Sequence, residues 1–397
     1  MRLKEVTVSA NTGLDAIKRA PIVEEETGLK CIRIQDISQG KDFDDWGNTV
    51  TTENDYKKFK LKINDLLVAR TGATVGVSYL VKKDYNAVFN NGSIRLRLSK
   101  DVNTRFVYYV FKSKSFGQYI DNVSCVATQP NLRVENLLRF TIPDIDKEQQ
   151  DEIVEILEKY DDLIENNTKR IKLLEQMAEN LYKEWFVRFR FPGHEGVEFE
   201  NGLPMGWVYT TIEDLSEILQ RGISPQYDDD GEYTVISQKC IRTSVVDFSE
   251  SRHQTKKYKS ELNLQDADIV ICSTGTGTLG RVGKVIGNYP NTTFDSHVTL
   301  VRAKAGISKQ YLYSAIKNMQ VWLENMGVGS TNQQELNRKT IKNAKIVLPD
   351  ENTMKRFEEI SKCIHDEIGS LIASRDNLTK QRDLLLPRLM SGKLEVK

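Results

Sequence analysis

The 397-residue chain has equal numbers of basic and acidic residues, and its formal net charge of zero argues against a free-standing basic nucleic-acid binder. No stretch approaches the ~20 consecutive apolar residues of a membrane span, and the first residues lack the apolar core of a signal peptide. We therefore expect a cytoplasmic protein with no membrane partner.

The first segment, residues 1–145, predicts a domain of mixed α+β structure. Runs rich in β-branched residues and bounded by Gly, Asn and Asp predict strands at 31–37, 66–69, 75–81 and 94–98. Aromatic and aliphatic residues at helical spacing predict a helix across 104–120. The mixture favours a curved or partly closed sheet with helices packed on it.

The next segment, residues 146–186, predicts a long helix with one narrow apolar seam. The seam residues recur at alternating steps of four and three, and only Asn167 among them is polar. So narrow a seam requires one partner helix rather than a broad core, and a lone Asn on it typically fixes the register. The seam comprises Ile153, Leu157, Tyr160, Ile164, Asn167, Ile171, Leu174, Ala178, Leu181 and Trp185.

After a Pro- and Gly-containing linker at 187–206, residues 207–349 repeat the pattern of the first domain. Strands are expected at 269–272, 282–286 and 298–301 and a helix at 309–326. The order of an acid, an apolar run and Thr-Gly at 65–72 recurs at 268–275, and each copy closes on Pro-Asp. A repeat of domain size indicates one task performed twice.

Residues 350–390 predict a second long helix with a comparable, less regular seam, and residues 391–397 form a tail. We expect this helix to pair with the first in antiparallel orientation, separating and following the two domains as a coiled coil. Pairing between two copies of the chain is the alternative. The second seam comprises Phe357, Ile360, Ile364, Ile368, Leu371, Leu378 and Leu385.

One motif is typical of an enzyme: residues 275–280 have the G-x-G-x-x-G spacing of dinucleotide-binding loops, which leaves a nucleotide-dependent enzyme as an alternative. A strand pattern follows it rather than a helix, so a tight loop on a β scaffold is favoured. The chain has no Asn/Asp-Pro-Pro-aromatic tetrapeptide of a methyltransferase, its five cysteines are scattered, and its four histidines do not cluster. We expect no catalytic residue and no metal site.

Polar residues suited to reading base edges recur at matching loop positions in the two domains. Arg, Asn and Gln make bidentate contacts to bases in the major groove, although any one of these residues also suits a turn cap or a solvated loop. The first domain contributes Gln35, Asp36, Arg70, Thr71, Thr74, Asn90, Asn91, Gln129 and Asn131. The second contributes Ser237, Gln238, Ser273, Thr274, Thr276, Ser296, His297, Asn332, Gln333 and Gln334.

Over essentially its whole length the chain resembles the specificity subunits of type I restriction-modification enzymes. The likeness is carried by residues 63–76, 128–132, 146–150, 184–186 with 202–207, and 385–394. The second copy departs from the first, because Ser273 replaces Arg70 and Glu335 replaces Asn131. The two domains are therefore expected to read different sequences.

The resemblance implies two target recognition domains, each reading one half of a split, asymmetric site in double-stranded DNA. It also implies that the helical pair sets the spacer and docks two modification subunits, which would bind S-adenosylmethionine and methylate a flipped adenine. A helix of about 38 residues spans about 57 Å, enough to hold two readers on major grooves one helical turn or more apart. Separate restriction subunits would use ATP and magnesium, while this chain would bind no cofactor and catalyse nothing. A coiled-coil scaffold without DNA specificity is the alternative.

Overall fold

The computed structural model describes residues 1–124, 131–329 and 334–390. These residues form two compact units, a first unit of Met1–Glu165 with Asp376–Lys397 and a second unit of Asn166–Arg375. Each unit therefore combines one mixed α/β domain with a segment of each long helix. The division between the two units falls within the two long helices and not at their ends. The domain boundaries predicted at 145, 186, 206 and 349 therefore stay predictions.

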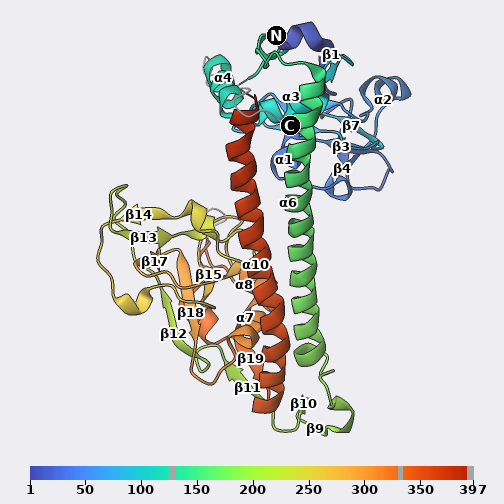
Figure 1. Ribbon diagram of the computed structural model, residues 1–397. Helices are drawn as coiled ribbons and strands as arrows, with labels where there is room; N and C mark the ends of the chain where they lie inside the picture. The colour runs from blue at the N-terminus through green and yellow to red at the C-terminus, as the bar shows by residue number, and fades with distance from the viewer. Residues whose placement is uncertain (125–130, 330–333, 391–397) are drawn as a thin grey trace. The chain divides into compact units, whose positions relative to one another are not determined.

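The domain of the first unit contains two four-stranded sheets (Figure 1). In the order β1-β8-β5-β6, the antiparallel sheet consists of Thr7–Thr12, Ser93–Leu98, Leu66–Ala69 and Ser78–Leu80. In the order β2-β4-β3-β7, the mixed sheet consists of Ile22–Val23, Gly47–Thr49, Lys30–Ile32 and Ala87–Phe89. The helices are α1 (Ile34–Ser38), α2 (Glu53–Phe59), α3 (Thr104–Phe111), α4 (Lys114–Ser124) and α5 (Val134–Leu138), with 3-10 turns at Leu3–Val6 and Phe43–Asp45.

The domain of the second unit repeats this architecture. Its antiparallel sheet, ordered β12-β18-β15-β16, consists of Ser216–Arg221, Val298–Ala303, Ile269–Cys272 and Val282–Lys284. Its mixed sheet, ordered β14-β13-β17, consists of Arg252–Gln254, Tyr233–Ile236 and Thr292–Phe294. Two short pairs add β11 (Val208–Thr211) with β19 (Lys345–Leu348), and β9 (Phe199–Glu200) with β10 (Leu203–Pro204). The helices are α7 (Lys309–Asn318), α8 (Gln320–Asn325) and α9 (Arg338–Lys342), with 3-10 turns at His194–Gly196, Gln238–Cys240, Phe248–Glu250 and Ser260–Leu262.

The repeated acid that precedes each central strand has a structural role. Asp65 accepts hydrogen bonds from the backbone N–H of Lys62 at 2.9 Å and from Arg97 Nε at 2.6 Å. Asp268 does the same in the second unit, where Arg302 Nε donates at 2.7 Å. The buried carboxylate thus fixes the turn into the strand and pairs with the neighbouring strand, which explains why the motif begins with an acid.

The two long helices are α6 (Lys147–Tyr182), which continues into a π-helical turn at Lys183–Val187, and α10 (Glu351–Met390). In the second unit, Asn167 Nδ2 donates to Ser374 Oγ at 3.2 Å and Arg170 pairs with Glu367 at 2.6 Å. A residue further along α6 thus contacts a residue nearer the start of α10, so the two helices run antiparallel. The predicted antiparallel coiled coil is confirmed within this unit. Its buried residues are Ile171, Ala178, Ile364, Ile368 and Leu371.

The same pairing continues in the first unit, where Arg382 of α10 donates to Asp161 of α6 at 2.6 Å. Leu386 and Leu389 of α10 join Ile153 and Leu157 of α6 in the core of the domain. The seam predicted from the sequence is therefore part of each domain's core as well as a contact between helices. Tyr160, Ile164, Leu174, Leu181, Leu378 and Leu385 are half-buried.

Some predictions of secondary structure and packing are wrong in part. The strand predicted over 31–37 ends at Ile32, because Asp36 accepts the backbone N–H of Arg33 at 2.9 Å and thereby caps α1. The helices predicted over 104–120 and 309–326 are each divided in two. Ile360 is 42% exposed, because the buried face of α10 runs through Phe357, Ser361 and Ile364 instead. Among the described residues no helix is long and apolar enough to cross a membrane.

Candidate nucleic-acid interface

The glycine loop of each domain joins two antiparallel strands of the sheet. In the first unit the Gly76 N–H donates to Ala69 O at 2.9 Å, and in the second the Gly280 N–H donates to Cys272 O at 2.8 Å. Gly275 has a φ of +105°, and a Cβ there would lie 2.4 Å from Gln238 Oε1, so only glycine fits. The loop leads into β16 and not into a helix, so the dinucleotide-binding interpretation of Gly275–Gly280 is wrong.

A second segment lies against the start of this loop in both domains. In the first unit the Leu132 N–H donates to Arg70 O at 2.7 Å, and Arg70 Nη2 donates to Asn131 Oδ1 at 3.1 Å. In the second unit the Leu336 N–H donates to Ser273 O at 2.8 Å. The structure thus brings Arg70 and Thr71 together with Asn131, and Thr274 together with Glu335.

A third segment follows the strands β7 and β17. The backbone N–H of Arg70 donates to Gly92 O at 2.8 Å, and that of Ser273 donates to His297 O at 2.8 Å. His297 is exposed, and its Nδ1 lies 2.6 Å from Thr274 Oγ1. Gly92 takes the place of His297 in the first unit, and Asn91 beside it is exposed. Three loops therefore meet at one edge of each domain and present polar side chains on rigid strands.

The third segment begins with an acid, Asp295, in the second unit and with an amide, Asn90, in the first. Burial raises the pKa of Asp295, whose carboxylate accepts the backbone N–H of His297 at 2.9 Å. The corresponding Asn90 is uncharged, and its Oδ1 accepts the N–H of Gly92 at 3.3 Å. Both side chains brace the same turn, so this pair has a scaffold role in addition to any contact with a ligand.

Two candidates are corrected by their burial. Asp36 is 1% exposed and pairs with Arg33 and Lys41, and Ser273 is 0% exposed, with its Oγ 2.6 Å from Thr299 Oγ1. Neither side chain reaches a base, because each is enclosed and already hydrogen-bonded.

The remaining candidates differ in their surroundings. Gln238 approaches the glycine loop, where Thr278 Oγ1 donates to its Oε1 at 3.2 Å, while Ser237 caps a 3-10 turn and Gln35 is exposed on α1. Thr276 and Gln334 are exposed and Thr71, Thr74 and Ser296 half-buried. Gln129, Asn332 and Gln333 lie outside the described residues.

Arg221 is a residue that the sequence did not single out. It ends β12, pairs with Glu335 and donates from Nη2 to Leu336 O at 2.8 Å. In the first unit, the guanidinium beside the second segment is that of Arg70, which follows β5. In the second unit it is that of Arg221 on β12. A comparison of the two copies could have found Arg221, because Ser273 stands where the first copy has Arg70. A second arginine near the segment around Leu336 was therefore to be sought on another strand.

Known proteins resemble this chain over most of its length. A family model described as the type I restriction modification DNA specificity domain matches residues 1–176 and 204–380. The type I restriction enzyme MjaIX specificity subunit of Methanocaldococcus jannaschii is 26% identical over 366 residues, covering 88% of this chain and 83% of that protein. The HindI specificity subunit of Haemophilus influenzae is 23% identical, with coverages of 80% and 82%.

The fold also has a solved counterpart. The crystal structure of the S subunit of a type I restriction-modification system from M. genitalium matches with a TM-score of 0.59 at 16% identity, covering 98% of this chain and 95% of that one. At this identity the match supports the fold, whereas the family model supports the family. The chain therefore belongs to the type I restriction modification DNA specificity domain family, with two copies of that domain in tandem.

Proposed function

We propose that this chain selects DNA sequences for a type I restriction-modification complex, and that each recognition domain reads one half of a bipartite, asymmetric site. The observation that carries the proposal is the meeting of three loops on one framework in both domains, with different side chains at equivalent places. Arg70 and Asn131 suit a purine edge, whereas Glu335 accepts hydrogen bonds from cytosine N4. Unlike halves follow from unlike loops.

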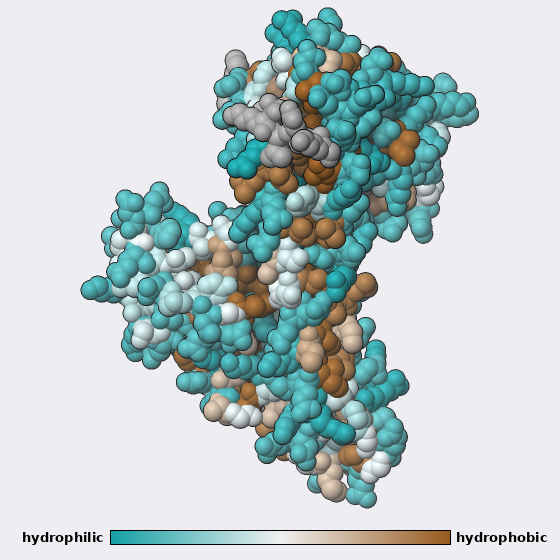
Figure 2. Space-filling view, viewed as in Figure 1, coloured by the Kyte–Doolittle hydropathy of each residue, from teal (hydrophilic) through white to brown (hydrophobic). Residues whose placement is uncertain are grey.

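We also propose that the two long helices set the spacer between the half-sites and dock two modification subunits. Hydrophobic side chains exposed along α6 support docking (Figure 2), since Leu173 is 63% and Met177 is 54% exposed, one turn apart. Exposed apolar residues at this spacing favour a partner helix. The docked subunits carry S-adenosylmethionine, the restriction subunits use ATP and magnesium, and this chain supplies no catalytic group.

The test is methylation of a randomised double-stranded DNA library by the chain reconstituted with its modification subunits. The expected consensus has two unlike halves separated by a fixed number of unread base pairs. Asn131→Ala should relax one half only and Glu335→Gln the other half only, while Arg139→Ala, an exposed residue at the end of α5, should change neither. A consensus that is continuous, or one in which either variant alters both halves, would contradict separate reading. Complete indifference to sequence would favour the scaffold alternative.

A further inference from the structure

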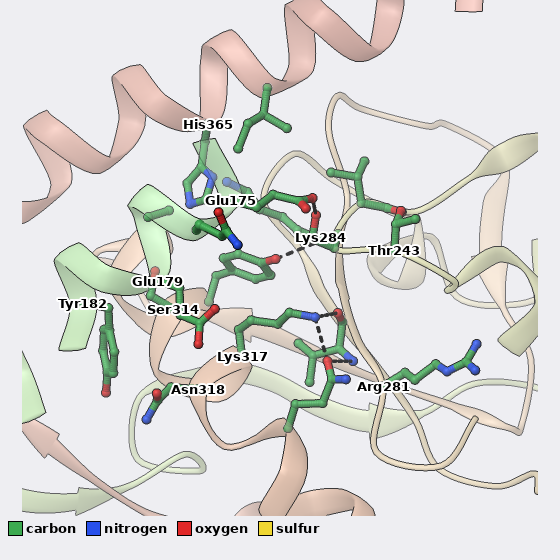
Figure 3. A pocket seen from close by; sticks show the side chains of 18 of the residues that line it. Glu175, Glu179, Tyr182, Thr243, Arg281, Lys284, Ser314, Lys317, Asn318 and His365 are labelled. Atoms are coloured by element: carbon green, nitrogen blue, oxygen red, sulfur yellow. Dashed lines mark hydrogen bonds between the residues drawn. The ribbon is translucent and has the colours of Figure 1, made fainter. Parts of the chain in front are cut away.

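A cavity of about 430 Å³ lies within the second unit, between the recognition domain and the adjoining segments of α6 and α10 (Figure 3). This volume is within the range of small-molecule sites. Its walls come from β16, α7 and both long helices, including the rings of Tyr182 and Tyr313. Its lining includes Arg281, directly after the glycine loop, but none of the candidate base-reading residues.

Lys284, which is buried, and Lys317, which is half-buried, line this cavity, and neither forms an ion pair with a carboxylate among the residues that the structure describes. Lys284, 5% exposed, donates from Nζ to Gln310 Oε1, and Lys317 Nζ donates to Gln320 Oε1 at 2.6 Å and to Val282 O at 3.2 Å. Burial lowers the pKa of Lys284 to about 8 and also lowers that of Lys317. Nearby carboxylates offset the effect of burial only in part, because the pKa of each lysine stays below its usual value. Enclosing an ammonium group without an ion-pair partner is costly, so an anion at this place would stabilise the charged form of both lysines.

His365 adds a third polar group. It projects from α10 toward the cavity (Figure 3), is 9% exposed, and its Nε2 is buried without a hydrogen-bond partner. Burial lowers the pKa of His365 to about 3, so its ring is neutral and can donate one N–H. Glu175 and Glu179 also line the cavity, where Glu175 accepts from Ser244 and Glu179 pairs with Lys183. Both glutamates raise the pKa of Lys317 and so offset part of the effect of its burial, although neither forms an ion pair with it.

The first unit supplies an internal comparison. Asp161 and His365 each lie fifteen residues beyond the aspartate that caps their helix, and Arg382 and Ala178 each lie thirty-two residues beyond the same caps. In the first unit Arg382 extends to Asp161 and their ion pair occupies this position. In the second unit alanine and histidine replace the pair, and the space of the guanidinium becomes part of the cavity.

A third difference between the two copies introduces a positive charge at the cavity. Leu80 pairs with the first residue of β5, and Lys284 pairs in the same way with the first residue of β15. The buried leucine of one copy is thus a buried lysine in the other. One copy has lost an arginine and gained a lysine at the same enclosed place, which favours a charged occupant over ordinary core packing.

We propose that the cavity binds a small phosphate ester, about the size of a nucleoside monophosphate, with its phosphate at Lys284, Lys317 and His365. Lysine is a common point-charge partner for phosphate, and the imidazole N–H donates to a phosphate oxygen. The rings of Tyr182 and Tyr313 offer flat surface to the organic part. Arg281, also in the lining, adds positive potential at the site, whereas Arg242 pairs with Glu250.

The test uses the full chain with adenosine 5′-monophosphate as the probe, and adenosine and inorganic phosphate for comparison. Calorimetry should find one site per chain, because the ion pair of Arg382 with Asp161 occupies the equivalent position in the first copy. At 100 times Kd the melting temperature should rise by about 5 °C or more. Adenosine, which lacks the phosphate, should bind at least about 30-fold more weakly.

Two variants restore the residues of the first copy. Lys284→Leu should fold, since Leu80 occupies the equivalent position, and should weaken binding about 30-fold or more, while Ala178→Arg should fill the space. Lys257→Leu, at an exposed position of the same unit, should leave binding unchanged. Absence of binding by the monophosphate, equal binding by adenosine, two sites per chain, or unchanged affinity in a folded Lys284→Leu protein would each overturn the proposal.

Discussion

Phe357 anchors the start of α10 in the core of the second unit, and its removal should be one of the more damaging changes in that unit. The ring is 0% exposed and lies 4.9 Å from Phe186 and 5.7 Å from Trp185 between ring centroids. Replacing a buried Phe by Ala costs about 3–5 kcal/mol through lost transfer energy and an unfilled cavity. For a unit of this size the melting temperature should fall by about 10 °C.

Urea denaturation of Phe357→Ala, followed by circular dichroism and by tryptophan fluorescence, measures this effect because Trp185 reports on the contact. Ile360→Ala is the matched control, since Ile360 is 42% exposed on the same helix and should cost less than about 0.5 kcal/mol. A loss below about 1 kcal/mol for Phe357→Ala, or equal losses for both variants, would refute the view that α10 is an integral part of the domain core.

Three further outcomes are expected. Arg70→Ala should reduce discrimination at one base pair of one half-site by about 1–3 kcal/mol, measured by methylation of mismatched duplexes, with the other half unaffected. Asp161→Asn should destabilise the first unit by about 2 kcal/mol at pH 7 in urea melts. Burial opposes ionisation of Asp161, but Lys112, Arg382 and the Tyr109 hydroxyl outweigh it and hold its pKa below the usual range. Its contribution is therefore full above the unfolded pKa of about 4 and is lost as the pH falls through the folded pKa, where variant and wild type should converge. Exchange of residues 1–145 for those of a relative should change one half-site in a methylome, whereas lengthening both helices should change only the spacer; a swap that alters both halves would contradict independent reading.

Much of the framework is readable from the sequence because local and tertiary preferences agree there. The strands predicted at 66–69 and 269–272 have the bounds found, since each is an apolar run that begins after an acid and ends one residue before Thr-Gly. The antiparallel helices followed from one narrow seam on each segment. The internal repeat is equally visible, because each copy has an acid before its central strand and an arginine on the neighbouring strand, and these form the ion pairs Asp65–Arg97 and Asp268–Arg302.

The failures occur where a side chain is used by its neighbours in three dimensions. The sequence suggests that Asp36 contacts a base, yet its side chain caps a helix and forms ion pairs with Arg33 and Lys41. Ile360 continues a heptad in sequence, yet α10 turns a face with Ser361 toward the domain. Arg221 and Lys284 were not singled out at all, because their significance depends on which residue of the other copy they replace.

The sharpest test of DNA selection by this chain is the methylome of its host with and without the gene. Deletion should abolish adenine methylation at one bipartite motif with two unlike halves and a fixed spacer, and a plasmid copy should restore it. If methylation at every motif persisted after deletion while the modification subunits were active, or if the lost motif were continuous or symmetric, the central claim would be contradicted.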